Sequence, residues 1–125
     1  MTFFFDNCTS PRLAKMLEAL GEDTVHLKSK FAEDTPDTTW LSEIGKSGMV
    51  LVTADNAILS RPHEKAAFRD AKLTAFFLPA AYQKKNLWGQ ALMLIKAWPN
   101  VRSEAQKAGR GAVFAVQENG AVKRR

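Results

Sequence analysis

Cysteine is almost absent from this sequence of 125 residues, in which Cys8 is the only one. An intrachain disulfide is therefore impossible, and nothing in the cysteine content indicates an oxidising compartment. Long apolar runs are absent as well, because no window approaches the ~18 apolar residues of a membrane-spanning helix. The start of the chain also lacks the basic and then apolar pattern of a signal peptide. We expect a soluble, unprocessed, cytoplasmic protein with no membrane partner.

Internal repeats, low-complexity segments and convincing linkers are missing too, which favours a single domain over residues 1–125. With 46% hydrophobic residues, the chain has enough apolar material for one sizeable core. Acidic residues are fewer than basic ones, at 13 against 18, so the formal net charge is +5. This excess favours an anionic partner such as nucleic acid.

Strand and helix patterns alternate along the chain. Strands are expected at 3–5, 24–27, 49–53 and 73–78, and helices at 11–20, 36–44, 62–70 and 83–108. Pro99 should end or kink the last helix near Trp98. Asn119-Gly120 predicts a hairpin turn between two short antiparallel strands at the end of the chain. We therefore predict an α/β fold, a three-layer α/β/α sandwich around a mostly parallel sheet.

Two aspartates follow predicted strands at the point where each strand ends. Asp6 ends the run Phe3-Phe4-Phe5, and Asp55 follows the run 49–53. Carboxylates at the carboxyl ends of neighbouring parallel strands converge in the crevice where open α/β sheets bind ligands. Asp37 lies in the first turn of the second helix, on the stripe of Leu41 and Ile44, and should point into the same crevice.

Three converging carboxylates indicate a divalent cation, because they would otherwise repel one another. Mg²⁺ and Mn²⁺ prefer oxygen ligands of this kind, and such an ion activates water and stabilises charge on phosphate. Each aspartate also has a structural explanation on its own. Asp6 and Asp55 are ordinary turn residues in their positions, and Asp37 suits the positive end of a helix dipole.

At these residues the chain resembles the PIN-domain nucleases, and more closely the compact PIN-like proteins related to the VapC toxins of toxin–antitoxin pairs. The resemblance covers roughly the first eighty residues. Its motifs are Phe3-Phe4-Phe5-Asp6-Asn7, Ser10-Pro11-Arg12-Leu13-Ala14, Pro36-Asp37 and Val50-Leu51-Val52-Thr53-Ala54-Asp55.

The resemblance implies a metal-dependent ribonuclease in which Asp6, Asp37 and Asp55 hold Mg²⁺ or Mn²⁺. It implies that the Thr53 hydroxyl orients the last carboxylate, with Asn7 and Asn56 as lesser candidates. Many relatives carry another acid where this chain has Ala57. The middle acid varies among relatives, so Asp34 or Glu33 is the alternative to Asp37. RNA is the implied substrate, and a toxin would have a cognate antitoxin protein covering its crevice.

Other polar and aromatic residues have weaker signals. Arg12 and Arg61 follow the strand ends of Asp6 and Asp55 and are placed to meet a scissile phosphate. Cys8 has no histidine obviously placed as its base, so thiol catalysis has little support. The three tryptophans lie among helical apolar residues and indicate core or dimer contacts, which makes a homodimer a further candidate; they are Trp40, Trp88 and Trp98.

Two other functions compete with the ribonuclease. The loss of the acid at Ala57 is compatible with a catalytically inactive PIN-like module that binds RNA or protein. A phosphoacceptor receiver domain has a similar length and aspartates after its first and third strands. That alternative is weaker, because receivers add a second acid, a Ser or Thr and a Lys where this chain has Asn7, Pro79-Ala80-Ala81 and Glu118.

Overall fold

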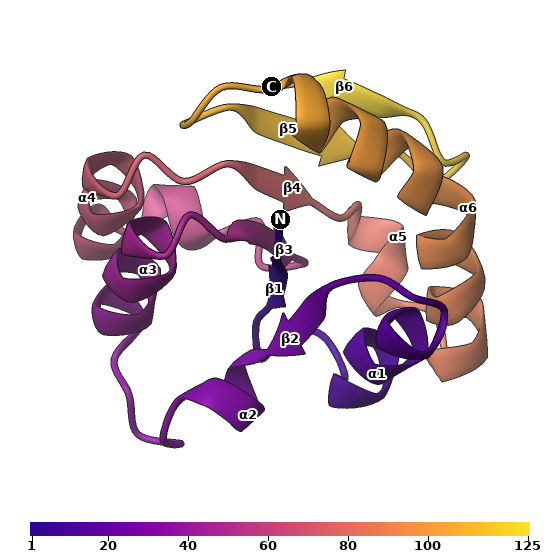
Figure 1. Cartoon of the computed structure of the whole chain (residues 1–125), viewed down its shortest axis with the longest axis horizontal. Helices are drawn as coiled ribbons and strands as arrows, with labels where there is room; N and C mark the ends of the chain where they lie inside the picture. Colours follow the sequence, from indigo (N-terminus) through magenta and orange to yellow (C-terminus); the bar gives the residue numbers. More distant parts are fainter.

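A computed structural model describes all residues, 1–125, around one six-stranded sheet (Figure 1). The strands lie in the order β2-β1-β3-β4-β5-β6; the first five are mutually parallel, and β6 pairs antiparallel with β5. They are β1 (Phe3–Phe5), β2 (Thr24–His26), β3 (Val50–Thr53), β4 (Ala75–Phe77), β5 (Val113–Val116) and β6 (Val122–Arg124). The predicted mostly parallel sheet and the closing hairpin are confirmed.

Helices cover both faces of the sheet, as Figure 1 shows. One layer contains α1 (Pro11–Ala19), α5 (Ala80–Gln83) and α6 (Leu87–Lys107). The opposite layer contains α3 (Asp37–Lys46) and α4 (Pro62–Asp70), with the short α2 (Leu27–Lys30) and the 3₁₀ turn η1 (Ile58–Ser60). The predicted three-layer α/β/α sandwich is therefore confirmed.

The strand β1 shows how the sequence fills both layers. Its side chains alternate between the two faces of the sheet, as strand geometry requires. Phe3 and Phe5 contact Trp98 in the layer of α6, whereas Phe4 stacks on Trp40 in the layer of α3. All three phenylalanines are buried. The apolar run thus forms a central strand with a core on each side.

Local signals determine where α1, the helix after the first strand, begins and ends. Ser10 caps α1 by accepting a hydrogen bond from the backbone N–H of Arg12, and Pro11 takes the first helical position. Gly21 follows the helix with a φ of +96°, a conformation that favours glycine.

Two elements differ from the sequence prediction. Leu27 begins α2 instead of ending β2, because His26 Nδ1 accepts a hydrogen bond from Lys28 N–H and caps the helix. The long helix begins at Leu87 instead of residue 83, after Asn86, whose side chain accepts from Gly89 N–H, and residues 80–83 form the separate short α5. Of the two outcomes expected at Pro99, α6 shows the kink: it continues to Lys107, and its two halves run in different directions in Figure 1.

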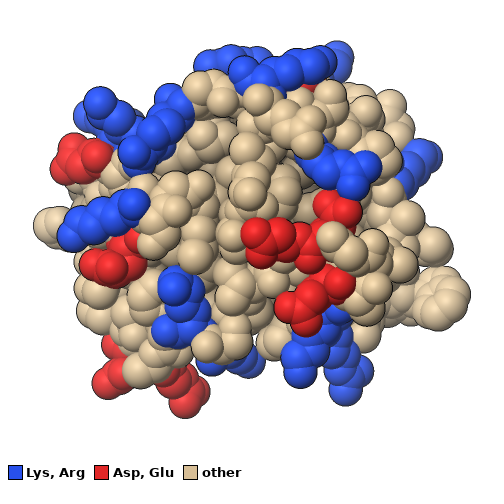
Figure 2. Space-filling view, in the orientation of Figure 1, with Lys and Arg blue, Asp and Glu red and all other residues tan.

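Charge is spread over the face drawn in Figure 2. Lys and Arg side chains lie around the rim, including a row along the top over the β5–β6 edge, and acidic side chains gather right of centre. The excess of basic residues is therefore not concentrated in one patch on this face. Among the helices, none combines the length and the apolar character needed to cross a bilayer.

Candidate active site

The register of the sheet places Asp6 beside Thr53. Phe5 in β1 pairs with Val52 in β3, so the next residue of each strand lies at the same carboxyl edge. The Thr53 hydroxyl donates to Asp6 Oδ2 at 2.5 Å and accepts from the backbone N–H of Asp55 at 3.0 Å. Asp6 Oδ1 accepts from Cys8 N–H at 3.2 Å. One buried hydroxyl therefore joins the Asp6 carboxylate to the backbone of Asp55, whereas the family resemblance implied that it orients the Asp55 carboxylate.

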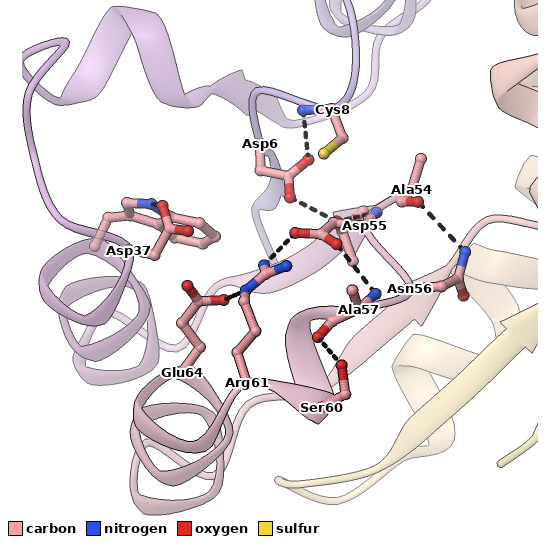
Figure 3. A network of polar contacts seen from close by, with 12 residues as sticks. Asp6, Cys8, Asp37, Ala54, Asp55, Asn56, Ala57, Ser60, Arg61 and Glu64 are labelled. Atoms are coloured by element: carbon pink, nitrogen blue, oxygen red, sulfur yellow. Dashed lines mark hydrogen bonds and ion pairs between the residues drawn. The ribbon is translucent and has the colours of Figure 1, made fainter.

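Asp55 lies at the same carboxyl edge of the sheet, and we call the surface around Asp6 and Asp55 the crevice, but the Asp55 carboxylate already has a cationic partner. Its Oδ1 accepts from Ala57 N–H at 3.1 Å, and its Oδ2 forms an ion pair with Arg61 Nη2 (Figure 3). Arg61 Nε pairs at the same time with Glu64 in the first turn of α4. These hydrogen bonds raise the pKa of Arg61 above its ordinary value. The guanidinium thus links two carboxylates at the mouth of the crevice.

Asp37 lies to one side of this pair. It is the first residue of α3, its side chain is exposed, and its Oδ1 accepts from the indole Nε1 of the buried Trp40 at 2.9 Å. Figure 3 shows it apart from Asp6 and Asp55. The predicted meeting of three carboxylates is therefore not seen, and no three His, Cys, Asp or Glu side chains lie close enough together to hold a metal ion. The hydrogen bond from Trp40, three residues after Asp37 in α3, explains the orientation of the Asp37 side chain.

Burial makes Asp6 the most perturbed carboxyl group. Its residue is 4% exposed, and its pKa rises from 3.8 to about 6, chiefly because burial disfavours the charged form. The hydrogen bonds from Thr53 and Cys8 lower the pKa, while the charges of Asp55 and Asp37 raise it. No Lys or Arg pairs with Asp6. The carboxylate is thus buried with hydrogen bonds but without a counter-ion.

The crevice as a whole is acidic in a basic protein. Asp55 and Glu64 pair with Arg61, Asp6 has no cation, and Asp37 lies to one side with its charge still acting on Asp6, so four carboxyl groups and one guanidinium give this edge a formal charge of −3. Phosphate is repelled by such a surface unless cations neutralise it. The arrangement therefore favours a cation before it favours nucleic acid.

Cys8 and His26 support the loop after β1 and have no role as a catalytic pair. Cys8 is an exposed residue, but partial desolvation of its thiol, followed by the charges of Asp6 and Asp55, raises the thiol pKa to about 12, so the thiol stays protonated at neutral pH. His26 Nε2 donates to the carbonyl of Thr9 at 2.8 Å, in the tautomer whose Nδ1 accepts from Lys28. Burial lowers the pKa of His26. It is a structural residue that ties β2 to the Asp6 loop.

The remaining predicted residues lie around the crevice without joining its hydrogen bonds. Asn7 and Arg12 are exposed after β1, and Glu33 and Asp34 are exposed in the loop before α3. Asn56 donates to the carbonyls of Ala54 and Leu78 and so holds the loop after β3 to the end of β4.

Two residues near the site were not identified from the sequence. Glu64 has an ordinary place in the first turn of a helix, and only its contact with Arg61 connects it with Asp55. Tyr82 is fully buried, its hydroxyl has no hydrogen-bond partner, and its pKa is raised first by burial and then by the charge of Asp6. Neither follows a strand end, so no local signal marks them.

The donor atoms of Asp6 and Asp55 are of the kind that a divalent cation of the magnesium type prefers, although only these two carboxylates lie side by side. Asp6 and Asp55 offer carboxylate oxygens at one edge of the sheet, and no thiolate or free imidazole joins them. Asp6 lacks a counter-ion, and its charge contributes to the raised pKa of the Tyr82 hydroxyl, which has no hydrogen-bond partner. With so few protein ligands, such an ion keeps several waters.

Comparison with known proteins agrees with this geometry. The family model described as a PIN-like domain matches residues 1–80, which include β1 to β4 and every residue of the crevice described above except Tyr82. No curated protein and no solved structure matched the chain. PIN-like domains are typically nucleases that use divalent metals, so the match supports a nuclease-type function in general and does not favour a receiver domain.

Proposed function

The chain belongs to the PIN-like domain family, and we propose that it is a divalent-metal-dependent endoribonuclease with its reaction centre between Asp6 and Asp55. The observation that carries this proposal is the Asp6 carboxylate, which is buried, lacks a counter-ion and lies beside a second carboxylate at the carboxyl edge of the sheet. Burying a carboxylate in this way costs stability unless a cation joins it. Selection for function explains such a cost more readily than folding does.

Asp6 and Asp55 would hold Mg²⁺ or Mn²⁺, and Thr53 fixes the position of both. When bound, the cation supplies positive charge for the phosphate and lowers the pKa of a coordinated water toward neutrality. Thr53 donates to Asp6 and accepts from the Asp55 backbone, so one side chain sets the spacing of the two ligands. Asp37 and Glu64 add negative charge at the rim and strengthen the attraction for a cation.

Arg61 has two roles in this proposal. In the structure its guanidinium pairs with Asp55, and it would have to leave Asp55 before that carboxylate could help to hold a cation. The same guanidinium donors would then be free to contact an RNA phosphate. Arg12, exposed in the first turn of α1, supplies a second phosphate contact.

The toxin assignment is a narrower proposal on the same site. If the ribonuclease is a toxin, its antitoxin has to neutralise a crevice of charge −3. A basic side chain placed between Asp6 and Asp55 does this by taking the place of the divalent ion. Co-expression of such a partner would restore growth to cells in which the active chain is toxic.

RNA cleavage by the purified chain tests the function. Wild type, Asp6→Asn and Asp55→Asn are incubated with a mixed RNA substrate in Mn²⁺, Mg²⁺ or EDTA. We expect cleavage that needs the metal and falls at least about a hundredfold in either variant, as when a group that stabilises the transition state is lost. Asp70→Asn, which changes an exposed acid in the last turn of α4, serves as the matched control and should cut as wild type does. Equal silence of all four proteins contradicts the proposal.

A catalytically inactive PIN-like module is the second candidate, and the ion pairs of Arg61 favour it. The guanidinium is already paired with both Asp55 and Glu64. Asp37 accepts a hydrogen bond from Trp40, and Ala57 stands where many relatives have an acid. In that case Arg61 is a permanent counter-ion and the protein binds its partner without cleaving it. Retained RNA or protein binding with no detectable uptake of Mn²⁺ would support this alternative.

A further inference from the structure

The long helix α6 presents a row of apolar side chains to solvent. Trp88, Leu92 and Ile95 are 76%, 56% and 45% exposed, and they are three of the five large hydrophobic residues exposed anywhere in the chain. Together with the exposed Pro99 they recur every three or four residues, so they lie on one side of the helix. We call this row the α6 stripe; at the right margin of Figure 2, uncharged side chains cover the first half of α6.

The α6 stripe is not needed to attach the helix to the sheet. The buried residues of α6 form a separate face; they are Met93, Leu94, Ala97, Trp98, Val101 and Ala105. Those residues belong to the core cluster that contains Phe3 and Phe5. Trp88, for which the sequence indicated core or dimer contacts, is therefore outside the core. An exposed tryptophan in line with two exposed aliphatic residues is typical of a contact surface.

A hollow runs beside the α6 stripe, between α6 and the turn that joins β5 to β6. Leu92 and Met93 give it apolar walls, and Gly89 has no side chain to fill it. Lys85 and Lys96 line its edges, with Glu118 and Asn119 from the turn, and Lys85 pairs with Glu118. The hollow and the stripe share Leu92, so the apolar row has a hollow beside it in which Lys96 is the unpaired charge.

The charge around the stripe distinguishes between possible partners. Residues 84–107 carry five basic side chains and one acidic side chain, Glu104, and with the paired acids Glu22 and Glu118 included the net charge of this surface is +2. Lys85 pairs with Glu118 and Arg102 with Glu22, but Lys84, Lys96 and Lys107 have no acidic partner. A second copy on this face would bring like charges together, whereas an acidic partner would complement them.

We propose that the α6 stripe docks an amphipathic helical segment of another protein, whose apolar row is flanked by Asp or Glu. From Trp88 to Pro99 the stripe extends about 16 Å at the rise of an α-helix, which is three turns and matches the usual anchor spacing of helix-in-groove recognition. The proposal does not depend on ribonuclease activity, because α6 covers the opposite face of the sheet from α3 and α4, which border the acidic crevice.

Helical peptides of defined charge test the proposal on the full chain. Three labelled peptides share one Leu and Ile row and differ only in flanking residues, which are Glu, Gln or Lys. Fluorescence anisotropy should show the Glu peptide binding about tenfold more tightly than the Lys peptide, with the Gln peptide between them. Lys96→Glu should reduce or invert this order, and Leu92→Asp should abolish binding of the Glu peptide. Leu20→Asp is the matched control, because Leu20 is 63% exposed at the end of α1 and should not affect binding.

Several results would overturn the proposal. They are the failure of all three peptides to bind, equal binding of the Glu and Lys peptides, and equal loss in the Leu92 and Leu20 variants. Sedimentation that shows a dimer of the wild type, dissociated by Leu92→Asp, would assign the stripe to a second copy instead. Circular dichroism of each variant verifies that the substituted, exposed side chains leave the fold intact.

Discussion

Asp6 is the residue in which folding and the proposed chemistry oppose each other. Its pKa of about 6 in the folded chain exceeds the ordinary value of 3.8, so the folded state holds the proton more tightly than the unfolded state. Stability from this group is therefore fully present below about pH 4 and is lost as the pH rises through about 6. Above pH 6 the buried carboxylate costs about 3 kcal/mol relative to its neutral form.

Asp6→Asn should consequently stabilise the metal-free protein in a pH-dependent way. We expect the variant to exceed wild type by about 3 kcal/mol in free energy of unfolding at pH 7 and by little at pH 4. Urea unfolding of both proteins in EDTA at the two pH values measures the difference. Asp34→Asn, at an exposed position, should show no such dependence. A gap of the same size at both pH values would contradict the assigned burial of Asp6.

Arg61 competes with a divalent cation for Asp55. Because its guanidinium pairs with Asp55 and Glu64, Arg61→Gln should free both carboxylates and tighten Mn²⁺ binding several-fold. Isothermal titration calorimetry without RNA measures this directly. Lys65→Gln removes the same charge from an exposed neighbour that forms no ion pair and is the control. Unchanged or weaker binding in Arg61→Gln alone would show that the guanidinium does not occupy the cation's position.

Among the elements, the contact between α3 and α4 depends on Gly45. A Cβ atom added there would lie 2.5 Å from Ala71 Cβ and 2.9 Å from the Ala71 carbonyl oxygen. Both contacts are too short, and the second is to backbone, so the helices have to separate. Gly45→Ala should cost about 1 to 3 kcal/mol of stability, as overpacking does. Gly109→Ala, which meets nothing within 4 Å, should be nearly neutral in the same urea titration; equal effects would contradict the contact.

The positions of most strands along the chain could be predicted from the sequence, because strand ends and turn residues are local signals. Phe3 to Asp6, the Ser10-Pro11 helix start and the Asn119-Gly120 hairpin all lie where the pattern places them. Pro99 does not end its helix. The neighbouring Trp98 and Val101 are buried, and the contacts of α6 with the sheet offset the hydrogen bond that proline lacks. Tertiary contacts of this kind are invisible to a local pattern.

The site was predictable only as far as backbone position determines it. Asp6 and Asp55 come together because adjacent parallel strands end at the same edge. The position of Asp37 depends on a side-chain rotamer chosen by the Trp40 indole, and that of Glu64 on the reach of Arg61. Neither contact can be predicted from the spacing of residues along the sequence. Helical periodicity likewise predicted an apolar α6 but gave no indication that Trp88, Leu92 and Ile95 form an exposed row.

For the molecule as a whole, an acidic crevice lies in a chain of net charge +5. If basic side chains elsewhere hold the RNA backbone, binding should release counter-ions and depend on salt. We expect the dissociation constant of a labelled single-stranded RNA, measured in EDTA to prevent cleavage, to rise about twentyfold between 50 and 200 mM salt, as for roughly three phosphate contacts. Affinity that does not change with salt would argue against electrostatic binding of the backbone.

If a divalent cation joins Asp6 to Asp55, crystals soaked in Mn²⁺ should show it by anomalous diffraction. We expect a manganese peak with oxygen ligands from both aspartates and Arg61 turned away from Asp55. Absence of a peak there, with Arg61 still paired to Asp55 in crystals of a preparation that cleaves RNA, would contradict it.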